Sequence, residues 1–335
     1  MPVSSETTFV TELKSMSKQL LLGLALLALA SMAAAQNPRV LLDTDRGPML
    51  LELDSVRAPN TVANFLSYVD DGSYNRSLIQ RVVPNFVVQG GGFKESGEGI
   101  VKRAAIPSER GNGLQHTSGT VAMALTSTNG VTNVNSATSD FFINTNTNAS
   151  LNADFTVFGR VVYGYKTLEE LNTTPIFFGS EQPIRMPLIR RAVRVASDEF
   201  PILPLHTGTW FDPDNSGKGF LIEITKASGA TNSDSPIVVV SWYDFFEGQQ
   251  FWTIGSAPFA WGASSVEIPM QISTGGQFGS AYMASQVTSN PQWGVLTIRF
   301  SDCSIGSFSY TSVYGNGTIP VRSLTSPLYE KCPGS

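Results

Sequence analysis

The chain has 335 residues, a formal net charge of −5 and a charged fraction of 15%. This length is enough for two ordinary domains with full hydrophobic cores. A mildly acidic chain without lysine or arginine clusters lacks the electrostatic footprint of nucleic-acid-binding proteins, so we expect no nucleic acid partner. The only histidines are His116 and His206, which excludes a multi-histidine metal centre, and the absence of a phosphate-cradling glycine loop leads us to expect no cofactor.

The N-terminus has the pattern of a targeting segment. Lys14 and Lys18 precede the apolar run 20–30, and the alanines at 33–35 supply the small residues that signal peptidases require. We therefore expect residues 1–35 to be a signal peptide, and the mature chain to be exported, periplasmic or extracellular. The run is shorter than the about 20 apolar residues of a membrane span, so we expect no span after cleavage, although a retained anchor stays an alternative.

The region up to residue 198 is predicted to be β-rich with two helices. Val62, Phe65, Leu66 and Val69 recur at three- and four-residue spacing and predict a helix that starts near Pro59. The second helix is expected near residues 166–171. The glycine-rich segment 90–99 is not expected to form regular structure. Strands are predicted over residues 39–44, 48–53, 77–83, 86–89, 119–125, 140–144 and 156–162.

The run IQRVVPNFVVQGGG over residues 79–92 carries the chemistry of this region. Arg81, Phe86 and Gln89 lie in two strand-like runs at alternating positions, so several of them can share one face of a sheet. An arginine in an apolar strand is costly to bury unpaired. Arg81 therefore reaches solvent, pairs with a carboxylate or binds a ligand, and the pattern alone leaves these alternatives open.

This run resembles the central motif of the cyclophilin-type peptidyl-prolyl isomerases, in which an Arg-Val-Ile-Pro-x-Phe-Met-x-Gln-Gly-Gly sequence lines the proline pocket. Further blocks agree in the same order: GTVAMA over 119–124, SATSDFFIN over 136–144 and VFGRVV over 157–162. The resemblance covers about residues 38–198. It implies an antiparallel eight-stranded barrel with a helix closing each end, and activity on proline-containing polypeptides without a cofactor.

The resemblance also implies the roles of single residues. Arg81 would be the catalytic residue that stabilises the twisted amide, and Gln89 would hold Arg81 or the substrate backbone. The remaining predicted substrate-binding residues are Phe86, Val87, Ala124, Phe142, Asn144, Leu151 and Phe155. From composition alone, the aromatic and aliphatic members of this set could equally be plain barrel core.

Two departures from the family pattern are possible modulators of activity. Gln80 stands where the family usually has histidine, and Asp140 stands where a glutamine is normal. A carboxylate at Asp140 could pair with Arg81 and draw it away from substrate, which would weaken catalysis. A loop insertion over 127–135 lies between two strands of the site and could narrow or extend it.

Composition changes beyond residue 198. Pro201 and Pro204 indicate a linker over 199–206, and all five tryptophans follow it. Short strands with glycine-rich turns predict a second all-β domain over 207–335, a small sandwich or barrel. It resembles an uncharacterised module of exported bacterial proteins, which implies no activity. In an exported chain the only two cysteines, Cys303 and Cys332, are expected to form a disulfide.

Two patterns in this second part leave alternatives open. Asp212, Asp214, Ser216, Gly217 and Glu223 fall at the spacing of an EF-hand calcium loop, but strand-like flanks favour a polar hairpin turn. The aromatic residues over 242–246 favour a domain core over a carbohydrate or peptide face.

The sequence thus predicts a signal peptide over 1–35, a cyclophilin-like domain over 36–198, a linker over 199–206 and a second all-β domain over 207–335. It also leads to two candidate functions. The first is a peptidyl-prolyl cis-trans isomerase for exported proteins, in which Arg81 is catalytic. The alternative is a non-catalytic protein that binds proline-containing chains in the same groove, for which Gln80, Asp140 and the insertion argue.

Overall fold

The computed structural model describes residues 37–195, 199–226, 236–277 and 279–325. The predicted signal peptide, 1–35, lies outside the described residues. Among the described residues, no helix combines the length and the apolar character that crossing a membrane requires.

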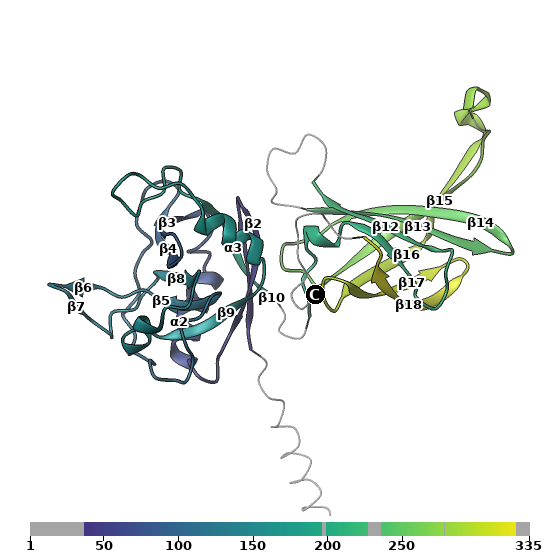
Figure 1. Cartoon of the computed structure of the whole chain (residues 1–335). Helices are drawn as coiled ribbons and strands as arrows, with labels where there is room; N and C mark the ends of the chain where they lie inside the picture. The colour runs from purple at the N-terminus through teal and green to yellow at the C-terminus, as the bar shows by residue number, and fades with distance from the viewer. Residues whose placement is uncertain (1–36, 196–198, 227–235, 278, 326–335) are drawn as a thin grey trace, which may run out of the picture. The chain divides into compact units, whose positions relative to one another are not determined.

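Eight antiparallel strands close the first barrel in the order β1-β10-β3-β4-β8-β5-β9-β2, as the resemblance predicts (Figure 1). Their side chains alternate between the barrel interior and its outer face, as the pleat of a strand requires. Val82, Val88, Val121 and Phe141 belong to the inner core. The strands are β1 (Arg39–Thr44), β2 (Gly47–Leu53), β3 (Ser77–Val83), β4 (Val87–Lys94), β5 (Thr120–Met123), β8 (Phe141–Asn144), β9 (Val157–Tyr163) and β10 (Leu188–Val195).

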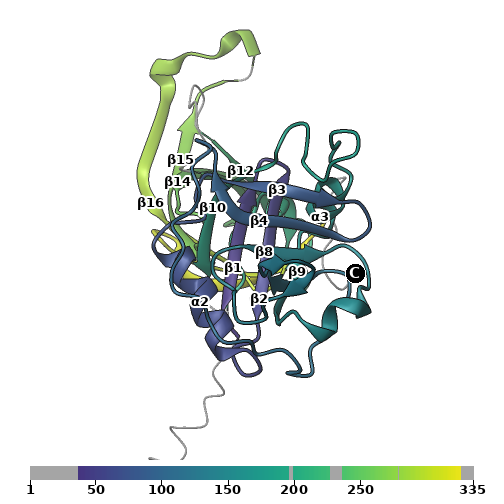
Figure 2. The ribbon, with the colours of Figure 1, turned by 90° about the vertical axis from the view of Figure 1, so that its left-hand side faces the viewer.

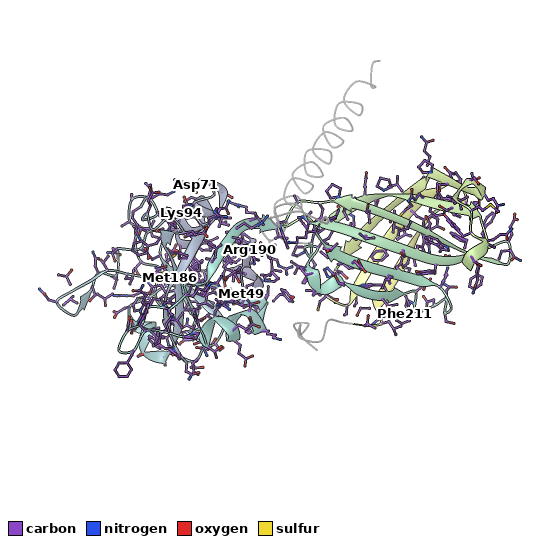
Figure 3. All side chains as sticks on the ribbon, turned by 90° about the horizontal axis from the view of Figure 1, so that it is seen from above. Met49, Asp71, Lys94, Met186, Arg190 and Phe211 are labelled. Carbon is purple, nitrogen blue, oxygen red and sulfur yellow. The ribbon has the colours of Figure 1, made fainter. Side chains whose placement is uncertain are left out.

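Two helices, α2 (Pro59–Asp70) and α3 (Tyr165–Asn172), lie against different parts of this barrel (Figure 2). The predicted stripe of α2 is buried in the barrel core, together with Leu168 and Leu171 of α3. In the turn after α2, the carbonyl oxygens of Gly72 and Asn75 accept from the Nζ of Lys94 at 3.3 Å and 2.9 Å. Lys94 and Asp71, the residue directly after α2, are labelled in Figure 3. This cation therefore satisfies carbonyl groups in the turn that follows the helix.

The prediction that residues 90–99 lack regular structure is wrong in its first half, because β4 continues to Lys94. Gly91 makes this possible. Its φ is +84°, and a Cβ at this position would lie 2.4 Å from the carbonyl oxygen of Ser139. The Ser139 hydroxyl donates to the Gly91 carbonyl at 2.7 Å. This bond holds β4 close to Ser139, at a position that has room for glycine only.

The insertion over 127–135 forms a small hairpin of its own, β6 (Ser127–Thr128) and β7 (Val131–Thr132). Its turn is Asn129-Gly130, with φ of +52° and +77°, which is the preferred chemistry of a type I′ turn. Figure 1 shows the hairpin projecting away from the strands of the first barrel.

The second part is a closed antiparallel barrel in which each strand pairs with the next, so of the two predicted architectures the barrel is correct. Trp210, Trp242 and Trp293 are buried in its core, whereas Tyr243 and Phe245 are each 49% exposed. The strands are β11 (Gly208–Phe211), β12 (Gly219–Thr225), β13 (Ile237–Phe246), β14 (Gln249–Pro258), β15 (Ser265–Gly275), β16 (Val287–Phe300), β17 (Ile305–Ser312) and β18 (Gly315–Ser323).

The EF-hand-like pattern is a turn between β11 and β12, which pair antiparallel on either side of it. Asp212 stabilises this turn because its carboxylate accepts from the Asp214 backbone N–H at 3.0 Å and from the Asn215 amide at 2.8 Å. The strands on both flanks agree with the hairpin alternative rather than with a helix-flanked calcium loop.

The segment predicted as a linker is well packed where the structure describes it. His206 is fully buried and its ring lies 3.7 Å from that of Phe300, while its carbonyl accepts from the Trp210 indole at 2.9 Å. Ile202 and Leu203 are also fully buried. Cys303 is buried, but Cys332 lies outside the described residues, so their pairing stays a prediction.

Candidate active site

One row of residues crosses four neighbouring strands on the outer face of the first barrel. Arg81 of β3 pairs with Gln89 of β4, Gln89 pairs with Phe142 of β8, and Phe142 pairs with Ala122 of β5. Paired residues in an antiparallel sheet point to the same side, so the predicted side chains of Arg81, Gln89 and Phe142 share one face.

An apolar cluster separate from the barrel core lies on this face, and we call it the site cluster. It combines residues from β3, β4, β5, β8, β9 and the loops between them. Six of the predicted substrate-binding residues are members: Phe86, Val87, Ala124, Phe142, Leu151 and Phe155. Val83, Leu114, Ala122 and Val157 complete it. The ring of Phe155 meets that of Phe142 edge to face at 5.5 Å.

Arg81 lies at the edge of this cluster with its side chain 33% exposed. Its Nε donates to the carboxylate of Glu181 at 2.6 Å, and its Nη1 donates to the amide oxygen of Gln89 at 3.2 Å. The arginine is therefore paired with a carboxylate and also reaches solvent, which keeps a cation available at the rim of an apolar surface.

A buried polar network supports the cluster from beneath. The Nδ2 of Asn144 lies 3.1 Å from Nδ1 of His116, and the Nδ2 of Asn148 donates to Oδ1 of Asn144 at 2.8 Å. Asn148 also donates to the Phe86 carbonyl at 2.8 Å, and Thr145 N–H donates to the same oxygen at 3.0 Å. These bonds fix the backbone of Phe86 next to the aromatic rings of the cluster.

Asn144 is placed differently from the sequence prediction. It is fully buried and its amide is bonded to Thr120, His116 and Asn148, so it supports the cluster instead of lining the substrate side. His116 is only 1% exposed, and burial lowers the pKa of its imidazole below the ordinary value of 6.5. The imidazole is therefore neutral at neutral pH and can accept the Asn144 proton at Nδ1.

Comparison with known proteins agrees with this geometry. The family model "cyclophilin type peptidyl-prolyl cis-trans isomerase/CLD" matches residues 39–193. The peptidyl-prolyl cis-trans isomerase of Acinetobacter baylyi is 40% identical over 152 residues, which are 44% of this chain and 78% of the relative. The chain belongs to the cyclophilin-type peptidyl-prolyl isomerase family.

Two other relatives match this cyclophilin with similar identity and coverage. Peptidyl-prolyl cis-trans isomerase A of Dickeya dadantii is 41% identical over 42% of this chain and 74% of its own length. Peptidyl-prolyl cis-trans isomerase B of Escherichia coli is 35% identical over 38% of this chain and 80% of its own length. The first barrel is thus the isomerase domain, and the family match ends before β11.

Asp140, the more unusual residue of this cyclophilin, is not bonded to Arg81. Its carboxylate pairs with Lys102 and accepts from the Gln80 amide at 3.1 Å. Arg81 has Glu181 as its acidic partner instead. The hypothesis that Asp140 draws Arg81 away from substrate is therefore wrong, and Gln80 and Asp140 form a separate polar pair.

Sequence reasoning missed His116, Asn148 and Glu181. His116 had one recognisable feature in the sequence, since it is one of only two histidines and lies three residues before Gly119, where the GTVAMA block starts. Glu181 had none, because it is 100 residues from Arg81 in a loop without a recognisable pattern.

Proposed function

We propose that the cyclophilin barrel catalyses cis-trans isomerisation of X-Pro bonds in exported proteins, without a covalent intermediate and with Arg81 as the catalytic residue. The single observation that carries this proposal is the position of Arg81, a partly exposed cation that Gln89 and Glu181 hold at the rim of the site cluster. That exported proteins are the clients rests on the targeting pattern of residues 1–35.

The chemistry needs no base or nucleophile. An X-Pro bond prefers trans by only about 0.5–1 kcal/mol, but rotation crosses a barrier of roughly 18–20 kcal/mol because it breaks amide resonance. In the twisted transition state the proline nitrogen is pyramidal and basic. A group that binds this state more strongly than the planar amide lowers the barrier.

Each part of the site has a role in that scheme. The site cluster offers an apolar, aromatic surface to the proline ring, so ring burial holds the substrate. Arg81 cannot lose its proton, and its guanidinium can donate to a carbonyl oxygen or to the proline nitrogen as the amide twists. Gln89 fixes one nitrogen of the guanidinium, which reduces the reorganisation required at the moment of rotation.

The non-catalytic alternative, for which Gln80, Asp140 and the insertion argue, loses one of these arguments. Asp140 was expected to pair with Arg81, whereas it is bonded to Lys102 and Gln80. The hairpin of the insertion, β6 and β7, remains as a surface that a larger client could contact.

The test is the cis-to-trans rate of a short Ala-Pro-Phe peptide with the wild type and with Arg81→Ala. Removal of one transition-state donor costs about 100- to 1,000-fold, so we expect kcat/KM to fall by that factor. Arg76→Ala is the matched control, because Arg76 directly precedes β3 and pairs with Glu95 away from the cluster. No acceleration by a folded wild type would overturn the proposal.

A further inference from the structure

The loop between α3 and β10 is anchored to the strand that carries Arg81. The carbonyl of Glu181 accepts from the Val82 N–H at 2.8 Å. Within the loop, Phe177 N–H donates to the Gln182 carbonyl at 3.0 Å, and Ser180 N–H donates to the Phe177 carbonyl at 3.0 Å. These backbone bonds hold Glu181 next to β3 independently of its carboxylate.

The Glu181 carboxylate contacts only one side of the Arg81 guanidinium. A guanidinium has five N–H donors. Glu181 takes the Nε donor at 2.6 Å and Gln89 takes one Nη1 donor at 3.2 Å. Among the described residues no acceptor takes the other three, so one Nη1 hydrogen and both Nη2 hydrogens stay available to a substrate.

We infer that Glu181 is a positioning residue for catalysis: it orients Arg81 through Nε so that the remaining donors face the bound amide. This inference rests on the proposed function of Arg81. Two acceptors on different nitrogens fix both the position and the rotation of a planar group, which a single acceptor at Gln89 cannot do.

A purely structural role explains the contact less well. The Glu181 side chain is 55% exposed, and ion pairs between exposed side chains contribute little to stability. The loop is already attached by the backbone bond to Val82. An inhibitory role is also disfavoured by geometry, because a carboxylate that blocked substrate would occupy the Nη donors.

Glu181→Ala and Glu181→Gln test the inference in the full-length protein. We expect Glu181→Ala to lower kcat/KM by roughly 5- to 30-fold, since small misplacement of a catalytic group is costly. The loss should lie mainly in kcat, because Arg81 acts on the transition state. Glu181→Gln keeps an acceptor oxygen at the same reach and should stay within about threefold of the wild type.

Glu95→Ala is the matched control, because Glu95 also pairs with an arginine, Arg76, at a distance from the site cluster. It should leave kcat/KM unchanged. The NMR signal of the Arg81 Nε–H, assigned by its loss in Arg81→Lys, gives a second readout. Its solvent exchange should accelerate in Glu181→Ala and stay slow in Glu95→Ala, which a general loss of stability would not produce.

The outcomes separate this inference from the function on which it rests. An active wild type together with an equally active or faster Glu181→Ala overturns the positioning role alone. Equal losses in Glu181→Gln and Glu181→Ala also overturn it, because charge rather than orientation would then matter. An inactive, folded wild type overturns the proposed function itself.

Discussion

The imidazole of His116 lies nearly parallel to the ring of Phe142, with centroids 5.8 Å apart and planes 14° apart. The buried, neutral His116 therefore packs against the ring of Phe142, a member of the site cluster, while its Nδ1 accepts from Asn144. This contact joins the polar network beneath the cluster to its aromatic wall.

The protonation of His116 should reduce activity in acid. Burial places the pKa of the folded imidazole below 6.5, so the neutral form is favoured in the native state. As the pH falls below 6.5 the unfolded chain gains the proton first, and folding stability declines. At the folded pKa, Nδ1 is protonated and can no longer accept from Asn144. We expect kcat/KM to fall there, with a single ionisation.

His116→Gln is the comparison for this pH profile, because its amide oxygen can accept from Asn144 but does not titrate in this range. The profile of kcat/KM should be flatter in this variant at pH values below 6.5, where the wild type loses activity. An identical acid limb in both proteins would assign the ionisation to another group.

Asp140→Asn should change activity little. Asp140 is bonded to Lys102 and Gln80 and forms no ion pair with Arg81, so the variant loses an ion pair that does not involve Arg81 or the site cluster. Partly exposed pairs of this kind contribute about 0–1 kcal/mol, so we expect kcat/KM to stay within about threefold. Peptide kinetics beside Arg81→Ala measure this, and a gain of tenfold or more would revive an inhibitory role for the carboxylate.

Gly91→Ala should destabilise the first barrel strongly. The variant would place an alanine at φ +84° and its Cβ 2.4 Å from the Ser139 carbonyl. The left-handed conformation alone costs about 1–2 kcal/mol, and the steric clash adds to it. Gly97→Ala measures the cost of the left-handed conformation alone, because Gly97 has φ +88° and a Cβ added there would have no other atom within 4 Å. Urea unfolding followed by circular dichroism should rank Gly91→Ala well below Gly97→Ala, and equal midpoints would contradict this account.

The second barrel should lose stability in acid through His206. Burial lowers its folded pKa to about 3, whereas the ordinary value is 6.5. Between these values only the unfolded chain binds the proton, so stability falls by about 1.4 kcal/mol per pH unit, or about 2 kcal/mol from pH 6.5 to pH 5.

Calorimetry of the wild type and His206→Asn across this pH range measures that slope. The asparagine oxygen can replace Nδ1 as acceptor for the Leu203 N–H, which lies 3.1 Å from Nδ1, but it does not titrate. The variant should be less stable at neutral pH and less sensitive to acid. Parallel pH profiles would show that His206 is not responsible.

The elements with strong periodicity were predicted within a few residues. β1 and β3 have the expected bounds, and the stripe from Val62 to Val69 predicted α2 correctly, because each pattern requires one buried face. Strand β4 was predicted too short, since the tolerance of Gly91 for the approach of Ser139 depends on a contact between distant segments.

The residues of the candidate site also divide into those that were predicted and those whose placement depends on distant contacts. The family resemblance predicted six members of the site cluster, whereas strand alternation alone indicated only that several of Arg81, Phe86 and Gln89 can share one face. It could not show that Asn144 is turned toward His116 or that Glu181 reaches Arg81, because both depend on how loops fold back over the sheet. Local pattern carries no information on such contacts.

All five tryptophans lie in the second barrel, so the chain has an optical label that the isomerase domain lacks. Intrinsic indole emission reports on the environment of β11 to β18, and one of these indoles, Trp261, also packs against Arg191 of β10 at 5.3 Å. A proline peptide that binds to the isomerase domain and shifts this emission would do so by communication from one barrel to the other. The unmodified protein therefore provides its own assay of whether its two halves act together.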